Sequence, residues 1–467
     1  MPLSFSKLAS ALLLTGTLVG CAAVVKTPYQ APSVSIPETF QNSKVLSQQL
    51  HAAVNTDQWW SLFNDPQLNQ LVQQVLASNN DLAVAGINLQ QARLQAGLTQ
   101  NKQGPRVNSS VSTGHSIDLN SGDDASRGLS VSAGVSYELD LFGKLARQTE
   151  ASQWEARATA QDLQSTAQSL IATTTTLYWQ LGYLNERYQI AQQNLASTQK
   201  TYDLVRVQYR AGAVSGLDLT SAEQAVQSQK ASLSQIEQQR VETRSALAVL
   251  LSRPVQQLNL QEPSRLPRTT LPTIASGLPA DLLARRPDLQ AAELRLRKVL
   301  ANKDATKASY YPSISLTGTL GTSSTSLTQL LQNPALTLGA NLSLPFLQYN
   351  DMKKDVALSD LDYEKAIVQY RQTLYQAFAD VENALSARTE LNQQVALQQR
   401  NVELAEKTER LTEVRYRNGA IALKNLLDAQ ATTRNARLAL VQTKQSQYNA
   451  YVTLMQALGG SPIKPLP

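Results

Sequence analysis

Residues that could carry catalytic or metal-binding chemistry are few in this chain of 467 residues. His51 and His115 are its two histidines, and Cys21 is its single cysteine. No metal-ligand spacing, nucleophile elbow or phosphate-binding loop accompanies them. The neighbouring carboxylates Asp123 and Asp124 lie in a polar loop, where we expect water to solvate them. The sequence therefore predicts a protein that is not an enzyme and that uses no cofactor and no metal.

Cys21 is the one residue whose surroundings indicate a covalent modification. Lys7 precedes an apolar run from Leu8 to Val19, which is too short to span a bilayer as a helix and is typical of the core of a signal peptide. The run ends in Leu18-Val19-Gly20-Cys21. This ending resembles the lipobox of bacterial lipoproteins, in which cleavage before the cysteine exposes it for acylation. We predict lipidation of Cys21; the alternative is an ordinary signal peptide with an incidental cysteine.

The overall composition favours long helices with solvent-exposed faces. Hydrophobic residues make up 42% of the chain, yet the mean hydropathy is −0.26, which suits close-packed amphipathic helices. The net charge of +6 is not concentrated in any run of Lys and Arg. Without a basic stripe, a nucleic-acid partner is not expected.

Two very long helices dominate the chain. Asp351 to Asn418 contains neither proline nor glycine and is rich in good helix formers. At about 1.5 Å per residue it predicts one helix roughly 100 Å long, which ends at Gly419 and is followed by a returning arm from Leu423 to Leu458. The stretch from Lys144 to Ala211 predicts a matching helix, interrupted only by Gly182. Shorter helices are predicted from Asp57 to about Leu76 and from Asp81 to about Gln100.

The chain repeats itself with one offset. Tyr209-Arg210-Ala211-Gly212 matches Tyr416-Arg417-Asn418-Gly419, 207 residues later (419 − 212). Asn80-Asp81-Leu82 matches Pro287-Asp288-Leu289 at the same distance. A single offset at separated places indicates an internal duplication, so we expect two halves of one architecture.

Each half also holds two runs that alternate between apolar and small polar residues, as a strand with two different faces does. These runs lie within residues 107–141 and 313–344. Their lengths suit outer-membrane strands, and no apolar stretch beyond the signal peptide is long enough for a transmembrane helix. A soluble β-hairpin laid on a helix is the alternative, but faces of Ser, Thr, Gly and Asn favour a water-filled lumen.

Four strands cannot close a barrel, and unpaired strand edges are costly in lipid. We therefore expect several chains to share one barrel. Two chains supply eight strands, and the interior of an eight-stranded barrel is filled by its own side chains. A conducting pore therefore favours three or more chains. The predicted domains are a signal peptide (1–20), a lipid-anchored extended segment (21–57), a first repeat (58–253), a Pro-rich linker (254–287), a second repeat (288–458) and a tail (459–467).

The order of lipobox, β-hairpin and long helical hairpin, followed by the hairpins again, resembles the TolC-like outer-membrane efflux proteins, in particular the lipoproteins that serve tripartite pumps. Leu282-Leu283-Ala284-Arg285-Arg286-Pro287-Asp288-Leu289 is similar to that family's Arg-Arg-Pro-Asp signature. Leu426-Leu427-Asp428-Ala429-Gln430 is similar to the start of its final long helix. The turns that end in Gly212 and Gly419 are similar to its two periplasmic helix turns.

This resemblance implies a mixed α and β membrane protein: a homotrimer with a 12-stranded barrel in the lipid of the outer membrane and an α-helical barrel in the periplasm. Partners would be a periplasmic adaptor, which meets the turns at Gly212 and Gly419, and an inner-membrane pump. Asp218, Tyr416 and Asp428 match positions that help to hold the inner end shut. One family acidic position falls on Asn425 here, which implies a weaker acidic ring.

Each of these gate residues also has a plainer interpretation. Asp218 follows Ser215-Gly216-Leu217 and suits a helix N-cap. Asp428 near a helix start is favoured by the macrodipole, and Tyr416 suits a core position. Gly212 and Gly419 are explained by the backbone of the turns alone.

The predicted function is a passive exit duct of a tripartite efflux pump for drugs or other small toxic compounds. Drug, metal-ion and siderophore export all fit, since selectivity is expected to reside in the pump. The alternatives are the exit duct of a protein-secretion system and a non-conducting coiled-coil lipoprotein.

Overall fold

The computed structural model describes residues 25–34, 40–43, 58–117, 124–267, 271–272, 285–326, 329–330 and 332–460. Cys21 and the predicted signal peptide lie outside these residues. The chain forms two compact units, each assembled from separate stretches. The sheet unit comprises Met1–Val34, Ile87–Gln161 and Leu289–Thr373, and the helical unit comprises Ser35–Gly86, Asp162–Asp288 and Leu374–Pro467.

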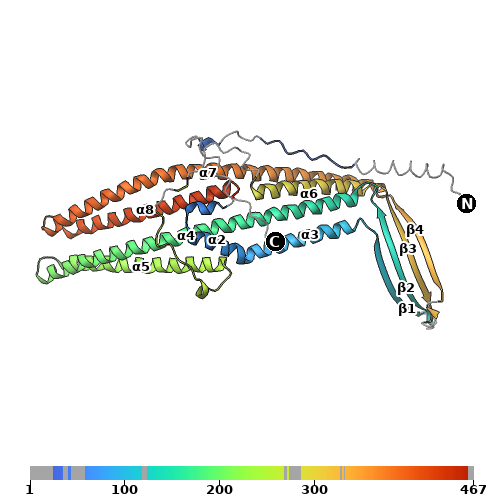
Figure 1. The fold of residues 1–467 in the computed structure, drawn as a ribbon, viewed down its shortest axis with the longest axis horizontal. Helices are drawn as coiled ribbons and strands as arrows, with labels where there is room; N and C mark the ends of the chain where they lie inside the picture. Colours follow the sequence, from blue (N-terminus) through green and yellow to red (C-terminus); the bar gives the residue numbers. More distant parts are fainter. Residues whose placement is uncertain are drawn as a thin grey trace. The chain divides into compact units, whose positions relative to one another are not determined.

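The sheet unit contains one antiparallel sheet of four strands in the order β1-β2-β3-β4 (Figure 1). Two hairpins form it, and β2 pairs with β3 to join them. The predicted duplicated hairpins are confirmed. The strands are β1 (Arg106–Ile117), β2 (Asp124–Leu139), β3 (Ser313–Ser324) and β4 (Pro334–Ser343).

The strand register gives the sheet one apolar and one polar face. Val107 pairs with Val135, Val135 with Gly318 and Gly318 with Leu338 on the apolar face. On the polar face the hydroxyls of Ser110 and Ser132 are 2.9 Å apart, and those of Ser112 and Ser130 are 2.7 Å apart. A slip of one residue would invert a strand's faces, so the alternation fixes this register. The apolar face is exposed in one chain, for example at Val107, Val111, Leu336 and Leu338.

The polypeptide leaves the first hairpin through a capped helix start. The carboxylate of Asp140 accepts hydrogen bonds from the backbone N–H groups of Leu145 (3.1 Å) and Ala146 (2.7 Å), which otherwise lack partners in the first turn. This turn begins α4 (Lys144–Arg210). The sheet unit also holds most of α3 (Asn80–Asn101) and α6 (Pro287–Ser309) and the first part of α7 (Tyr349–Arg417).

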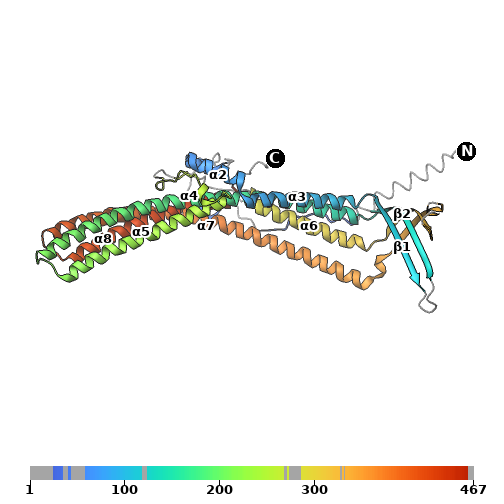
Figure 2. The ribbon, with the colours of Figure 1, turned by 90° about the horizontal axis from the view of Figure 1, so that it is seen from below.

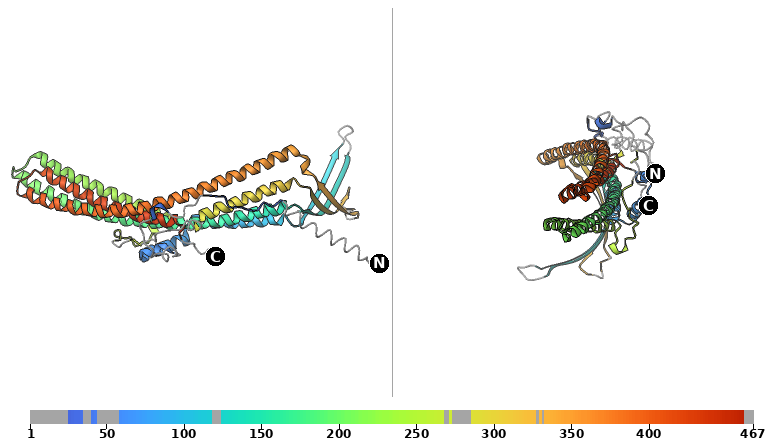
Figure 3. Two further views of the ribbon diagram at one scale, coloured as in Figure 1. Left: turned by 90° about the horizontal axis from the view of Figure 1, so that it is seen from above. Right: turned by 90° about the vertical axis from the view of Figure 1, so that its left-hand side faces the viewer.

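The helical unit is built on two helical hairpins. One joins α4 to α5 (Gly216–Leu250), and the other joins α7 to α8 (Leu423–Ala457). Their turns lie at the same end of this unit, and the end-on view in Figure 3 shows the α4/α5 pair (green) beside the α7/α8 pair (orange and red). The observed ends of α4, α7 and α8 lie within two residues of the predicted ones. Among the described residues, no helix has the length and apolarity that a membrane span needs.

The prediction of one helix from Asp57 to Leu76 is wrong. A short 3₁₀ helix, η4 (Trp59–Phe63), ends at Asn64, whose φ of 52° is left-handed. Asp65 then caps α2 (Pro66–Ser78) by accepting hydrogen bonds from Gln67 and Leu68. Asp65 followed by Pro66 is a helix start, and it breaks the longer helix in two.

An aromatic cluster forms part of the core of the helical unit. Trp59 and Trp60 are 2% and 4% exposed and are therefore packing residues. The ring of Phe63 lies 5.3 Å from that of Trp179 and 5.2 Å from that of Tyr451. Because Trp179 belongs to α4 and Tyr451 to α8, this cluster ties the two hairpins together.

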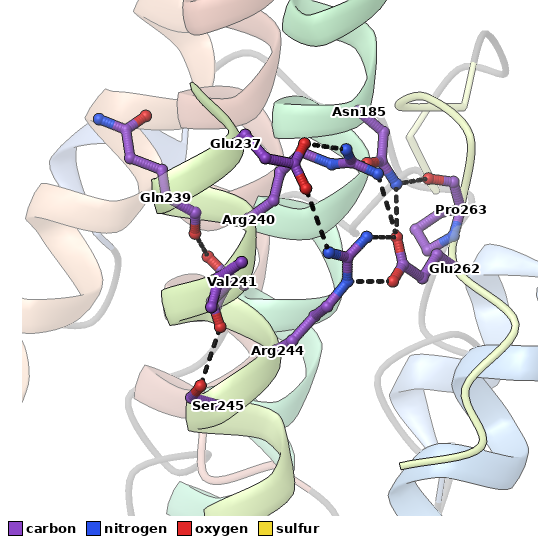
Figure 4. A network of polar contacts seen from close by, with 10 residues as sticks. Asn185, Glu237, Gln239, Arg240, Val241, Arg244, Ser245, Glu262 and Pro263 are labelled. Carbon is purple, nitrogen blue, oxygen red and sulfur yellow. Dashed lines mark hydrogen bonds and ion pairs between the residues drawn. The ribbon is translucent and has the colours of Figure 1, made fainter. Parts of the chain in front are cut away.

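A strap, defined here as residues 260–267, crosses the helical unit. Asn185 of α4 donates to the carbonyl of Pro263 (2.9 Å), and Tyr448 of α8 donates to the carbonyl of Pro267 (3.3 Å). A Cβ on Gly182 would lie 3.2 Å from the carbonyl oxygen of Arg265. The one glycine of α4 therefore stands where the strap approaches the helix too closely for a side chain. Glu262 anchors the strap to Arg244 of α5 (Figure 4).

Candidate functional site

Both hairpin turns have the same backbone, and it requires glycine. Gly212 has a φ of +74° and Gly419 one of +69°. The N–H of Gly212 donates to the carbonyl of Tyr209 (2.9 Å), and the N–H of Ala213 donates to that of Gln208 (2.9 Å). The second turn repeats both bonds at Gly419 and Ala420. This is the Schellman motif, and it explains the two glycines without a ligand.

The two turns are held together by one hydrophobic cluster. Its buried members come from all four helices next to the turns. Tyr202 and Leu219 pack against it. The ends of the two hairpins are therefore coupled, because neither can shift without disturbing the shared packing. The buried members are Val205, Ala222, Tyr416, Leu423 and Leu426.

Tyr416 is both a core residue and part of a polar contact. Its ring is 6% exposed, and its hydroxyl donates to the side-chain oxygen of Gln208 (2.8 Å). Burial, and then the negative charge of Asp218, raise the pKa of Tyr416 above its ordinary value. Tyr416 thus links the two hairpins through Gln208, within electrostatic reach of Asp218.

Asp218 caps its own helix, but as the third helical residue and not as the N-cap. Ser215 is the N-cap of α5, and its hydroxyl accepts from the N–H of Asp218 (3.2 Å). The Asp218 carboxylate in turn accepts from the N–H (3.1 Å) and the hydroxyl (2.7 Å) of Ser215. This reciprocal pair is a capping box.

The second turn lacks a capping box. Ala422 and Asn425 stand 207 residues after Ser215 and Asp218, at the same helix positions. Ala422 is the N-cap of α8 and makes no side-chain bond, and Asn425 is exposed. The second turn therefore lacks the capping box as well as an acidic residue at position 425.

Asp428 is exposed and carries a partner of opposite charge. The ammonium group of Lys424 donates to its carboxylate at 2.6 Å, one helical turn away. Both side chains are more than half exposed, so the pair contributes little to stability. It does lower the net negative charge at the second turn.

Sequence reasoning missed two residues of this site. Val205, fully buried in the cluster, lies three positions after Tyr202, a coiled-coil spacing that could have identified it. Gln208 had no such signal, because a polar residue gives no periodicity and its partner Tyr416 is far away in sequence.

Comparisons with known proteins match nearly the whole chain. The model of a family described as outer membrane efflux protein matches residues 71–253 and 278–460. These two stretches begin 207 residues apart (278 − 71), which is the offset of the internal duplication. The duplication predicted from the sequence is therefore also present in the family.

Individual relatives cover both halves. The pyoverdine export outer membrane protein OpmQ of Pseudomonas putida is 31% identical over 418 residues, which cover 87% of this chain and 89% of that protein. The antibiotic efflux pump outer membrane protein ArpC of Pseudomonas putida is 30% identical over 453 residues, covering 95% and 93%. The solved structure of the outer-membrane channel OprN is similar with a TM-score of 0.80 and 29% identity, covering 92% of this chain and 99% of that one.

Proposed function

We infer the function from the family: the chain belongs to the outer membrane efflux protein family, so it is an outer-membrane channel component of an efflux pump and not an enzyme. We propose that three copies form this channel, that the paired helix turns form its periplasmic gate, and that these turns receive a periplasmic adaptor which links the channel to an inner-membrane pump. Lipidation of Cys21 would anchor each copy. Relatives that export pyoverdine or antibiotics support small organic molecules as the exported class.

The observation that carries the trimer is the open sheet. β1 and β4 are its outer strands, and an outer strand in lipid leaves backbone N–H and C=O groups without partners, at a cost of several kcal/mol each. Pairing β4 of one copy with β1 of the next removes this cost. Three copies supply twelve strands, enough for a conducting barrel, whereas two supply eight.

The gate proposal is supported by the shared cluster at the turns. Tyr416 contacts Gln208 of the other hairpin and lies near Asp218, so an outward movement of either hairpin must break this contact. Asp218 and Asp428 would add negative charge around the inner opening. Asn425 and the Lys424–Asp428 pair would make that ring weaker than one with a further acid.

Single-channel conductance in planar bilayers tests the gate. Asp218→Asn and Asp428→Asn remove a negative charge but keep an acceptor oxygen, and we expect each to raise the conductance or open probability of the purified channel. Tyr416→Phe, which removes only the hydroxyl that Gln208 binds, should do the same.

Glu223→Ala is the matched control, because this exposed acid lies on α5 beyond the turn. It should conduct like the wild type. If none of the three gate variants changes conductance or opening, the gate assignment is wrong, although the channel function would stand.

A further inference from the structure

The sheet unit contains an apolar cavity where the strands give way to helices. Its volume is about 560 Å³, within the range of about 300–1,000 Å³ that small-molecule sites occupy. The end of α6, the residues that lead from it to β3, the short helix η8 (Pro345–Leu347) and the start of α7 form it. Figure 2 shows α6 and α7 as ribbons. Its lining includes Tyr310, Tyr311, Phe346, Tyr349, Met352 and Lys353.

The aromatic wall of this cavity is fixed by contacts behind it. The ring of Tyr311 stacks on that of Phe142, with centroids 4.7 Å apart. The hydroxyl of Tyr310 donates to the carboxylate of Asp355. These contacts orient the two rings, so the cavity is largely preformed.

Two lysines lie at the cavity, and within the described part of the chain only one of them is paired. The ammonium group of Lys307 lies 3.4 Å from Asp360, which Lys303 approaches more closely at 2.8 Å. Lys353 is exposed and makes no ion pair or hydrogen bond with any residue that the structure describes. An apolar cavity beside an unpaired cation is complementary to a ligand with an anionic group and an apolar chain.

The position of the cavity indicates where such a ligand would come from. Pro312 and Phe346 of its lining lie next to β3 and β4, whose apolar faces expose Leu338 and Leu342. Because the protein lies in the outer membrane, these strand ends reach the boundary between lipid and periplasm. Tyrosine is enriched at such boundaries, and lysine extends its ammonium group toward the headgroups there.

We propose that this cavity binds a phospholipid of the periplasmic leaflet, with an acyl chain among the aromatic rings and the phosphate at Lys353. The lipid would fill the space between α6 and α7 where they meet the barrel. The proposal rests on the outer-membrane location and not on the assignment of the gate.

Native mass spectrometry of the delipidated, detergent-purified full-length assembly tests it. Phosphatidylglycerol should bind with one molecule per subunit. Lys353→Gln should weaken this binding about fivefold, the effect of roughly one basic contact at a membrane surface. Met352→Trp, which fills the cavity, should abolish it. Lys354→Gln is the matched control, because Lys354 is an exposed neighbour outside the lining, and it should bind as the wild type does.

Further outcomes separate this site from other occupants. Diacylglycerol, which lacks the phosphate, should bind weakly, and inorganic phosphate should not displace the phospholipid. Equal binding by Lys353→Gln and Lys354→Gln, or displacement by inorganic phosphate, would overturn the proposal. Failure of the Met352→Trp chain to assemble would also overturn the proposal. It would indicate that a neighbouring subunit, and not a lipid, fills the cavity in the wild-type assembly. Conductance of Lys353→Gln should remain at the wild-type level, which keeps this test separate from that of the channel function.

Discussion

At the scale of single residues, the two turns share a backbone but differ in their caps. In the first, the carboxylate of Asp218 accepts from the backbone N–H of Ser215, and the hydroxyl of Ser215 accepts from the backbone N–H of Asp218. In the second, Ala422 has no side-chain acceptor for the first turn of α8. A missing cap costs about 0.5–2 kcal/mol of helix stability, so the start of α8 should open more often than the start of α5.

The double variant Ala422→Ser, Asn425→Asp should install the missing capping box. We expect a gain of about 1 kcal/mol in the local stability of α8, which slows amide hydrogen exchange over residues 423–426 about fivefold. Mass spectrometry of the exchanged peptides measures this effect. Ala420→Ser, which adds a hydroxyl to the turn but not at the N-cap, serves as the control. Unchanged exchange in the double variant would mean that packing by Leu423 and Leu426 already holds the helix start.

At the scale of elements, a charged clamp holds the strap to the α4/α5 hairpin. The guanidinium of Arg244 donates two hydrogen bonds to Glu262, through Nε and, at 3.0 Å, through Nη2. Asn185 donates to the same carboxylate (3.2 Å) and accepts from Arg240 (2.7 Å). Figure 4 shows that these side chains from two helices converge on Glu262. Hydrogen bonds to charged groups contribute roughly 1.5–3 kcal/mol each when protected from water, and this clamp is about three-quarters buried.

Because Glu262 is titratable, we expect the stability of the strap to depend on pH. Burial acts to raise the pKa of Glu262, but the hydrogen bonds from Arg244 and Asn185 and the nearby positive charges outweigh it, and the net pKa is lowered. A lowered pKa means that the carboxylate stabilises the folded strap above the ordinary pKa of about 4.3 and loses this effect as the pH falls through the lowered value.

Glu262→Gln should therefore loosen the strap at pH 7, measured as faster proteolysis or hydrogen exchange within residues 260–267. Wild type and variant should converge only as the pH falls below the lowered pKa of Glu262, where the wild-type carboxyl is protonated as well. Glu242→Gln removes a charge from an exposed position of α5 and should have no effect on the strap. A difference between wild type and Glu262→Gln that persisted at low pH would argue against the charge as its cause.

At the scale of the whole molecule, assembly depends on which way each strand faces. Leu338 lies near the middle of β4, on the apolar face, and is 77% exposed in one chain. Thr337 pairs with Thr319 on the polar face. Leu338→Arg should cost about 2–4 kcal/mol per chain, the cost of a lipid-facing arginine at mid-membrane, and should reduce the amount of SDS-resistant oligomer on unheated gels.

Thr337→Arg is the matched variant on the lumen side. It should assemble normally and change the conductance or ion selectivity, because its side chain would face water. Assembly of Leu338→Arg at the wild-type level would show that the apolar face does not meet lipid.

The sequence alone determined the local structure and the family of this protein. The alternation of apolar residues with Ser or Gly over residues 129–136 predicts a two-faced strand. The long stretch from Asp351 predicts the α7 helix, because both patterns depend on neighbours close in sequence. The motifs at Gly212 and Gly419 likewise fix their turns through local backbone geometry. The Arg-Arg-Pro-Asp signature and the repeated offset of 207 residues were sufficient to indicate the efflux family.

Only the tertiary structure decided the contacts between distant segments. It placed Gln208 against Tyr416, Glu262 against Arg244 and the strap against Gly182, and it brought Lys353 to an apolar cavity. The partners in these contacts are separated in sequence. Most of the contacts join polar side chains, and the one at Gly182 depends on a missing side chain, so none of them produces a periodic pattern of apolar residues. Such contacts follow from how the helices pack, which sets the distances between side chains that the sequence keeps apart.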